Sequence, residues 1–451
     1  MQGHTTEMRV KKLTCMPAIA TAIALAGCPL TLGAKYTVGG TLTGLHGTGL
    51  VVQDSAGKQL TLDSNGEFTL SDRLQNKDTY AVTVVTQPSS PAQTCSVRNG
   101  SGTIGKTNVT NVIVKCIEAG RFAYVANQLS NNISAYAINS SGALGAIAGS
   151  PFATTEAAPI ALTVDPNGQF LYVANNSSND VSIFAIDDVT GELSSAGFPA
   201  PTGSGPVALT IDPTDHFLYV ANLSSNSVSA FSIDQTSGLL SAVAGSPFAI
   251  GVGPSSLKVD PNGNFLYVAN FDGADVSVLQ IDPVSGALTA VSGSPFGAGT
   301  GPDSVVIDPT GSFAYVANQS SHSISEYAIN ASNGALAPVS GSPMGVSVSP
   351  ESLAVDPAGR YIYVANAPAN NQVSSYSITP ASGALTLSSS AAAGTLPASV
   401  AVDPAGGFIY VANDNSADIS VYSVNSGSGA LTAVSGSPFG AGNGPRSIAI
   451  D

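Results

Sequence analysis

The tetrapeptide Tyr-Val-Ala-Asn recurs from residue 124 onward at a nearly constant interval of 47 or 48 residues. A repeat of this length that holds four β-type segments is typical of one blade of a β-propeller. No stretch shows the 3.6-residue periodicity of an amphipathic helix, which excludes helical repeats. The copies begin at Tyr124, Tyr172, Tyr219, Tyr267, Tyr315, Tyr363 and Tyr410. The sequence therefore predicts an all-β protein with a seven-bladed β-propeller.

Each repeat divides into four strands separated by turn residues. In the copy that starts at Pro254 we expect an inner strand over 255–260 and further strands over 265–270, 275–281 and 287–292. Between the first two strands, Asp-Pro-Asn-Gly places a residue preferred by a type I turn at each position. We interpret the aspartates that open these turns as turn residues rather than as a carboxylate site; they are Asp165, Asp212, Asp260, Asp308, Asp356 and Asp403.

The two ends of the repeat region complement each other. The chain ends in 445–451, an inner strand without a partner of its own, and the first repeat begins with a second strand that lacks an inner one. A ring closed by pairing 445–451 with 121–127 leaves no exposed sheet edge at the join. We expect the propeller to occupy 117–451 and to close in this way.

A smaller β-rich region precedes the propeller. Residues 36–116 carry about seven short β-type stretches with turn residues between them, which predicts an Ig-like β-sandwich, with 28–35 as a linker. Cys95 and Cys116 lie in this region, and we expect them to form a disulfide in an oxidising compartment. A metal site is the alternative, but the two cysteines have no nearby histidine and no C-x-x-C spacing. We expect no metal and no cofactor.

The N-terminus has the pattern of an export signal. Three basic residues precede an uncharged apolar run over 13–26, which is too short to span a bilayer. The run ends in Leu-Ala-Gly-Cys, which resembles a bacterial lipobox and implies removal of 1–27 and lipid attachment to Cys28. An ordinary signal peptide with a chance cysteine is the alternative. Because residue 29 is Pro rather than Asp, we expect a lipid-anchored protein of the bacterial cell envelope, at the outer membrane or cell surface.

Charge limits the partners of the propeller. The whole chain carries a net charge of −15, and residues 117–451 hold four basic against twenty-three acidic residues. Binding to nucleic acid requires clustered Lys and Arg, so we expect no nucleic-acid partner and no membrane contact other than the lipid anchor. An anionic ligand of the propeller would meet an opposing field.

The repeats have the form P-x-S-x-x-V-D-P-x-G-x-F-x-Y-V-A-N, followed by V-S-x-Y-x-I and L-x-x-V-x-G-S-P-F. Over about 117–451 this resembles the seven-bladed lactonase family, whose members include 6-phosphogluconolactonase, and the Y-V-T-N propellers of bacterial surface proteins. The resemblance implies a propeller and, for the lactonases, hydrolysis of a lactone ring. It also implies His and Arg at the channel mouth, often as His after the Pro that opens the inner strand. No Pro-His dipeptide occurs in this sequence.

The candidate site lies where the loops converge on the channel. Asp303, Glu351 and Arg446 follow the strand-opening prolines of three repeats, and His322 lies in a loop at the same face. For a lactonase, Glu351 or His322 would activate water and Arg446 would stabilise the developing oxyanion. The alternative is a hydrated polar rim without chemistry. Asp303 is a candidate ligand-binding residue.

Lys258 stands out on an inner strand, where the other repeats have short or β-branched side chains. Its ammonium group either extends into the channel and binds an anionic ligand or pairs with a carboxylate.

Two functions remain open. The first is an exported, lipid-anchored propeller that binds a small molecule or a protein at its mouth. The second is an extracytoplasmic lactonase, for which a neutral lactone suits the acidic propeller better than a sugar phosphate does.

Overall fold

The computed structural model describes residues 35–45, 47–88, 93–118, 122–154, 156–367 and 369–451. The signal segment, Cys28 and all but the last residue of the expected linker lie outside the described residues. The described part of the chain is built from strands and turns, and it contains no helix that is long and apolar enough to cross a membrane.

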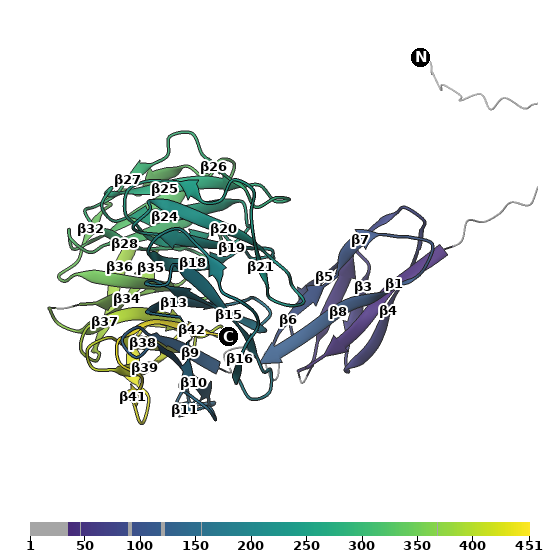
Figure 1. Ribbon diagram of the computed structural model, residues 1–451, viewed down its shortest axis with the longest axis horizontal. Coiled ribbons are helices and arrows are strands. Elements are labelled where there is room, and N and C mark those ends of the chain that lie inside the picture. The colour runs from purple at the N-terminus through teal and green to yellow at the C-terminus, as the bar shows by residue number, and fades with distance from the viewer. Residues whose placement is uncertain (1–34, 46, 89–92, 119–121, 155, 368) are drawn as a thin grey trace, which may run out of the picture.

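Seven sheets radiate around a central axis and form the predicted propeller (Figure 1). Each sheet begins at the axis with a six-residue inner strand that opens on Pro. These strands are β13 (Pro159–Val164), β18 (Pro206–Ile211), β23 (Pro254–Val259), β28 (Pro302–Ile307), β33 (Pro350–Val355), β37 (Pro397–Val402) and β42 (Pro445–Ile450).

The second strand of each blade ends in Tyr-Val-Ala-Asn and is almost completely buried, because it lies between two strands of its own sheet and between two neighbouring blades. These strands are β9 (Phe122–Asn127), β14 (Phe170–Asn175), β19 (Phe217–Asn222), β24 (Phe265–Asn270), β29 (Phe313–Asn318), β34 (Tyr361–Asn366) and β38 (Phe408–Asn413). The third strands are β10 (Asn132–Ile138), β15 (Asp180–Ile186), β20 (Ser227–Ile233), β25 (Asp275–Ile281), β30 (Ser323–Ile329), β35 (Gln372–Ile378) and β39 (Asp418–Val424).

The outer strand is divided into two short pieces in six blades, whereas the sequence predicted one strand. In five of these blades a serine explains the division: Ser294 Oγ, for example, accepts the N–H of Val278 at 2.9 Å, in place of a backbone carbonyl. The first pieces are β11 (Leu144–Ala146), β16 (Leu193–Ser195), β21 (Leu240–Ala242), β26 (Leu288–Ala290), β31 (Leu336–Pro338), β36 (Leu385–Ala392) and β40 (Leu431–Ala433). The second pieces are β12 (Phe152–Ala153), β17 (Ala200–Pro201), β22 (Phe248–Ala249), β27 (Phe296–Gly297), β32 (Met344–Gly345) and β41 (Phe439–Gly440). Only β36 is continuous, in a repeat that lacks Gly-Ser-Pro. The repeat with β16 and β17 has Gly-Phe-Pro there and is still divided.

The predicted ring closure is confirmed. The C-terminal strand β42 pairs antiparallel with β9, and Ile448 lies opposite Val125. The side chain of Asp451 adds a hydrogen bond of 2.7 Å from the N–H of Phe122. The first blade therefore takes its inner strand from the end of the chain.

Buried tyrosine hydroxyls connect six of the seven blades to the next one. The hydroxyl of Tyr124 donates to the carbonyl of Gly191 in a turn of the following blade at 3.0 Å. The equivalent bond recurs at Tyr172, Tyr219, Tyr267, Tyr315 and Tyr410. The tyrosines of the repeat are core residues, and all except Tyr363 have a hydroxyl that is satisfied by the neighbouring blade.

The expected turn role of the repeat aspartates is confirmed. Asp260 Oδ1, for example, accepts the N–H groups of Asn264 and Phe265 at 2.6 and 2.7 Å. These carboxylates stabilise the turns at the end of the ring opposite the start of the inner strands.

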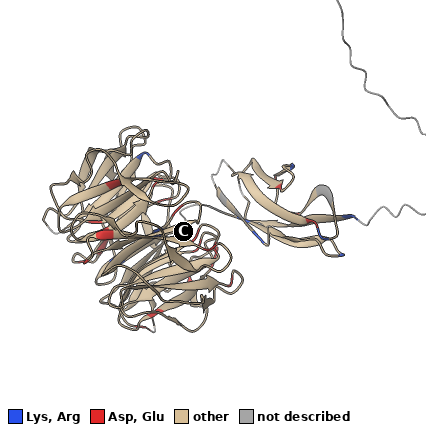
Figure 2. Cartoon of the chain, turned by 90° about the horizontal axis from the view of Figure 1, so that it is seen from above, with Lys and Arg blue, Asp and Glu red and all other residues tan. Residues whose placement is uncertain are grey.

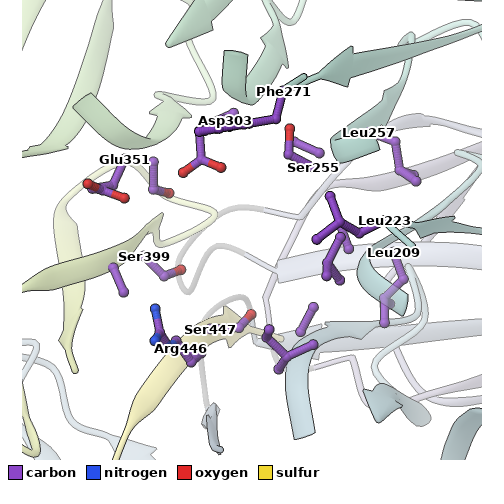
Figure 3. Close-up of a pocket in the computed structure, with 18 of the residues that line it drawn as sticks. Leu209, Leu223, Ser255, Leu257, Phe271, Asp303, Glu351, Ser399, Arg446 and Ser447 are labelled. Carbon is purple, nitrogen blue, oxygen red and sulfur yellow. The ribbon is translucent and has the colours of Figure 1, made fainter. Parts of the chain in front are cut away.

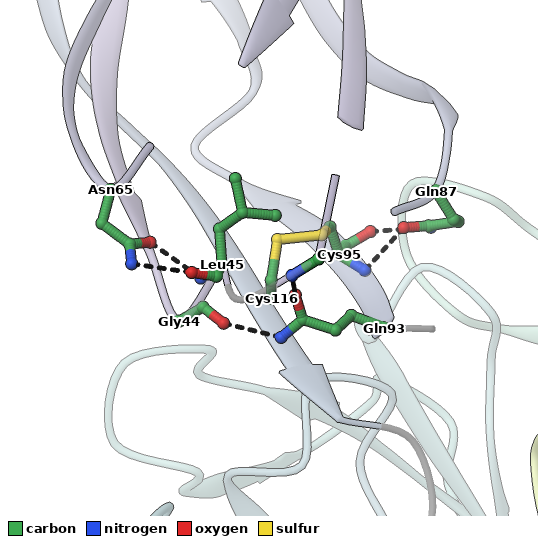
Figure 4. Close-up of a disulfide and its surroundings, with 8 residues drawn as sticks. Gly44, Leu45, Asn65, Gln87, Gln93, Cys95 and Cys116 are labelled. Carbon is green, nitrogen blue, oxygen red and sulfur yellow. Dashed lines mark hydrogen bonds between the residues drawn. A yellow bond between two sulfur atoms is a disulfide. The ribbon is translucent and has the colours of Figure 1, made fainter. Parts of the chain in front are cut away.

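The N-terminal domain consists of two four-stranded sheets that share one hydrophobic core, as a sandwich requires. One sheet contains β4 (Gly66–Gln75), β1 (Lys35–Thr43), β8 (Val109–Glu118) and β6 (Gln93–Arg98). The other contains β3 (Gln59–Leu62), β2 (Leu50–Asp54), β5 (Thr79–Thr86) and β7 (Ser101–Thr103). The sequence did not predict β7. The predicted disulfide between Cys95 and Cys116 joins the adjacent strands β6 and β8 (Figure 4).

One arginine of the sandwich reaches the propeller. Arg98 Nη2 lies 3.5 Å from Asp165 and 3.6 Å from Asp215, and Nη1 donates to the carbonyl of Gln235. Both aspartates belong to turns between the inner and second strands. The sandwich therefore contacts the turn end of the ring, and Figure 2 shows how sparsely Lys and Arg occur on the propeller side of this junction.

Candidate functional site

A cavity of about 640 Å³ opens at the end of the ring where the inner strands begin (Figure 3). The residue after each strand-opening proline lines it, because those residues lie at the top of the seven inner strands that surround the axis. They are Ile160, Val207, Ser255, Asp303, Glu351, Ala398 and Arg446. This is the end of the ring opposite the Arg98 junction.

Two carboxyl groups from neighbouring blades meet in this cavity. Asp303 on β28 and Glu351 on β33 interact through their charges and through a side-chain hydrogen bond. Gln319, directly after β29, donates from Nε2 to Glu351 Oε2 at 2.8 Å. The structure thus brings together two of the predicted site residues and adds a glutamine that orients one of them.

The surroundings shift the proton affinity of both carboxyl groups. Burial, followed by the charge of Glu351, raises the pKa of Asp303 to about 7, although Arg446 opposes the shift. Burial also raises the pKa of Glu351, while the hydrogen bond from Gln319 and the charge of Arg446 lower it. Near neutral pH the arrangement favours one proton between the two groups, held by Asp303, with Glu351 ionised.

Arg446 is the cation among the described residues that line the cavity. Its Nη2 forms an ion pair of 3.1 Å with the buried carboxylate of Asp414, and its Nε donates to Gln128 Oε1 at 3.2 Å. These two contacts fix the guanidinium plane, and Figure 3 shows the group directed toward the carboxyl side of the cavity. Arg446 is therefore held in position to face a ligand rather than moving freely in solvent.

His322 does not join this group, in contrast to the sequence-based expectation. It is exposed, lies outside the cavity and has a φ of 51° at the turn into β30. Its carbonyl accepts the N–H of Val346 at 2.9 Å. The same left-handed position holds Asn131, Asn179 and Asn226 in other blades, so the residue shapes the turn, and its exposed side chain does not line the cavity.

Lys258 occupies a different level of the channel. Ser256, two residues earlier on β23, lines the cavity, and alternation along a strand places Lys258 on the same side but nearer the turn end. Its side chain is accessible from the channel, but the protein atoms that surround the channel limit its hydration and lower its pKa. The described residues offer its ammonium group no ion pair or hydrogen bond. Of the two alternatives for Lys258, the pairing with a carboxylate is not formed among the described residues, and binding of an anionic ligand stays a prediction. Lys258 does not line the cavity that contains Asp303.

The residue that directly follows each Tyr-Val-Ala-Asn also belongs to the site in several blades, and it was not predicted from the sequence. In three blades this residue lines the cavity as Leu223, Phe271 or Gln319, and in two others, as Gln128 and Asp414, it holds Arg446. The repeat itself contained the signal, because this position varies while the four residues before it do not.

The described residues contain no group of three or more His, Cys, Asp or Glu side chains that could hold a metal ion.

Comparison with known proteins places the chain in a family. Residues 79–250, 242–350 and 346–444 match the family described as "Lactonase, 7-bladed beta-propeller". These matches span most of the chain, and it belongs to this family. No curated protein sequence matches the chain.

Solved structures share the fold at low identity. A candidate 6-phosphogluconolactonase from Bacteroides uniformis has 20% identity and a TM-score of 0.65, covering 72% of this chain and 98% of its own. A corresponding protein from Bacteroides fragilis has 20% identity and a TM-score of 0.65, covering 72% and 96%. The periplasmic gluconolactonase of Pseudomonas aeruginosa has 21% identity and a TM-score of 0.64, covering 72% and 98%. At these identities the likeness shows the common propeller fold.

Proposed function

We propose that this protein hydrolyses an uncharged lactone at the cavity formed by Asp303, Glu351 and Arg446. The observation that carries the proposal is the convergence of two carboxyl groups from adjacent inner strands beside a fixed guanidinium group. Membership of the lactonase family supports the reaction class. The sequence alone favoured a binding module, but the paired carboxyl groups favour hydrolysis.

The reaction needs a base, an acid and a group that stabilises negative charge. Ionised Glu351, oriented by Gln319, takes a proton from water as the water oxygen attacks the carbonyl carbon of the lactone. Arg446 stabilises the negative charge that develops on the carbonyl oxygen. When the ring C–O bond breaks, protonated Asp303 gives its proton to the leaving alkoxide. The hydrogen bond between the two carboxyl groups then returns the proton from Glu351 to Asp303.

Charge favours a neutral substrate over a phosphorylated one. Asp303 and Glu351 both face the ligand, and the one arginine of the described lining is already paired with Asp414. A phosphate group would add negative charge to a cavity that holds an excess of carboxyl groups.

We also propose that the protein acts outside the cytoplasm, anchored to the membrane through Cys28. The signal-like pattern over 1–27 supports this proposal, as does the disulfide in the sandwich, since disulfides persist in oxidising compartments. In this arrangement the sandwich is the spacer between the membrane and the propeller.

A module that binds a ligand at the same mouth without chemistry is the competing function. The observation in its favour is that Arg446 already has a carboxylate partner. The test is hydrolysis of a panel of γ- and δ-lactones by the full chain, followed as acid release at constant pH, with Glu351→Gln as the matched variant. We expect hydrolysis that this variant lowers at least a hundredfold; binding without acid release by the wild type would favour the module.

A further inference from the structure

The cavity has two chemically different sides. Figure 3 shows Asp303, Glu351 and Arg446 on one side and leucine side chains on the other. The second side is formed by blades two to four, and Asp272 is the one charged residue that these blades contribute to the described lining. Its non-polar residues are Ile160, Leu162, Val207, Leu209, Leu223, Leu257 and Phe271.

This division arises at three repeat positions, all of which are non-polar in the third blade, with Val207, Ala208 and Leu223. The second blade is polar only after Tyr-Val-Ala-Asn, at Asn176, and the fourth only on its inner strand, at Ser255 and Ser256. After the strand-opening proline, Ile160 and Val207 stand where other blades have Asp303, Glu351 and Arg446. After Tyr-Val-Ala-Asn, Leu223 and Phe271 replace polar residues such as Gln319. At the third position of the inner strand, Ala161 and Ala208 replace the serines of the other five blades, which are Ser256, Ser304, Ser352, Ser399 and Ser447.

The fold itself does not require this non-polar side. Polar residues occupy the same positions in the other blades of the same ring, where the inner strands have the same length and pairing. Leu223 is 37% exposed, and Ile160 and Phe271 are only partly buried and pack against none of the hydrophobic cores, so these side chains do not complete a packed core. Partly exposed apolar groups that gather in a cavity are typical of a ligand site.

We infer that the substrate is a lactone that carries a non-polar substituent, such as an alkyl chain on the ring, which lies against the non-polar side while the ring carbonyl faces Asp303, Glu351 and Arg446. This inference rests on the proposed function for the reaction, and on the apolar lining for the substituent. A polyhydroxylated sugar lactone would leave its hydroxyl groups without partners on that side.

The cavity has room for such a ligand. Its volume of about 640 Å³ lies within the range of about 300–1,000 Å³ that is usual for small-molecule sites. The non-polar side also continues below the mouth, because Leu209, which is only partly buried, lies two residues deeper on its strand than Val207. A chain of several methylene groups therefore gains contacts along its length.

The experiment measures kcat/KM of the full chain for a series of δ-lactones whose ring substituent grows from hydrogen to heptyl, with glucono-δ-lactone for comparison. Burial of one methylene group is worth about 0.8 kcal/mol, so we expect kcat/KM to rise about threefold to fourfold with each added methylene. Efficiency that is independent of chain length, or highest for glucono-δ-lactone, would overturn the inference.

Two variants test whether the non-polar side of the cavity causes the dependence of kcat/KM on the length of the substituent. In the double variant Leu223→Gln and Phe271→Gln, each position receives the residue type that Gln319 has at the same place in its blade. We expect the dependence on chain length to flatten and kcat/KM for the longest substrate to fall at least tenfold. Leu129→Gln is the control, since Leu129 is 72% exposed and lies outside the cavity, and it should leave the series unchanged. An equal loss in the control would contradict the assignment.

A binding measurement separates this inference from the proposed reaction. The δ-lactams with the same substituents resemble the lactones but resist hydrolysis, and their affinities can be measured by calorimetry. If affinity rises with chain length while no lactone is hydrolysed, the non-polar site is supported and the proposed reaction is wrong. If the lactams bind without regard to chain length, the inference is wrong even where lactones are hydrolysed.

Discussion

The hydroxyl of Tyr410 donates a hydrogen bond of 3.2 Å to the carbonyl of Gly142, which joins the last blade to the first across 268 positions of sequence. In the blade before it, the hydroxyl of Tyr363 is buried without any partner among the described residues. At the same position of the repeat, Tyr410 therefore has a hydrogen bond to the neighbouring blade and Tyr363 does not.

This pair gives a test of how the ring is stabilised. Tyr410→Phe removes a satisfied hydrogen bond and should lower the free energy of unfolding by about 1 kcal/mol. Tyr363→Phe removes an unpaired buried hydroxyl and should be neutral or stabilising. Thermal unfolding of the two variants measures the difference, and equal losses would show that Tyr363 has a partner in solution.

The junction between the sandwich and the propeller depends on Arg98. Its side chain is only 12% exposed, and its removal leaves Asp165 and Asp215 facing each other without a cation. Breaking such a pair costs about 3 kcal/mol, so Arg98→Ala should release the sandwich from the turn end of the ring. We expect a larger radius of gyration in solution scattering and faster hydrogen exchange over 212–217.

Lys115→Ala is the control for this junction. Lys115 contacts Asp188, which is 54% exposed, at 3.3 Å, and such a surface pair contributes less than about 1 kcal/mol. If both variants leave the scattering profile unchanged, Arg98 does not hold the two domains together.

The raised pKa of Asp303 also makes stability depend on pH. Between the unfolded value near 3.8 and the folded value of about 7, the folded protein binds more protons than the unfolded chain, so this group makes the protein less stable as pH rises through that window. Asp303→Asn lacks this effect. The melting temperature of the variant relative to the wild type should therefore increase from pH 4 to pH 7 and stay constant above. A difference that is independent of pH would place the pKa of Asp303 near its ordinary value.

The lipid anchor can be tested independently of the fold. We expect the wild type, expressed in a bacterial host that processes lipoproteins, to partition into the detergent phase and Cys28→Ala to appear in the aqueous phase. Cys15→Ala alters a cysteine within the signal segment and should partition like the wild type. Detergent-phase recovery of the Cys28 variant would rule out attachment through that residue.

Most of the fold could be predicted from the sequence because every repeat carries the same pattern of buried strands and turn residues. Each Tyr-Val-Ala-Asn marks a strand buried on both sides, each Asp-Pro turn marks the preceding hairpin, and the unmatched ends imply the closure of 445–451 on the first blade. The second piece of the outer strand was not predicted because Gly-Ser-Pro is typical of a turn. In the structure Ser294 Oγ accepts the N–H of Val278, which keeps the outer strand paired with the third strand at this point.

The site was only partly predictable. Strand geometry places the residue after each proline at the mouth, which located Asp303, Glu351 and Arg446. Within a loop, however, sequence does not say which residue turns inward: Gln319 reaches Glu351, while His322, three residues later, faces away. The contact of Arg98 with two turns of the propeller depends on how the domains dock, and no local pattern encodes it.

The pH dependence of lactone hydrolysis tests the central claim most directly. The enzymatic kcat/KM, after subtraction of the hydroxide-catalysed rate without protein, should fall as pH rises through about 7, because Asp303 then loses the proton that it must give to the leaving alkoxide. Asp303→Asn should lower kcat/KM at least a hundredfold at pH 6 and remove the decline. A rate that stays level to pH 9 in the wild type, or a decline that persists in the variant, would contradict the assignment of Asp303 and Glu351 as the acid and base of a lactonase.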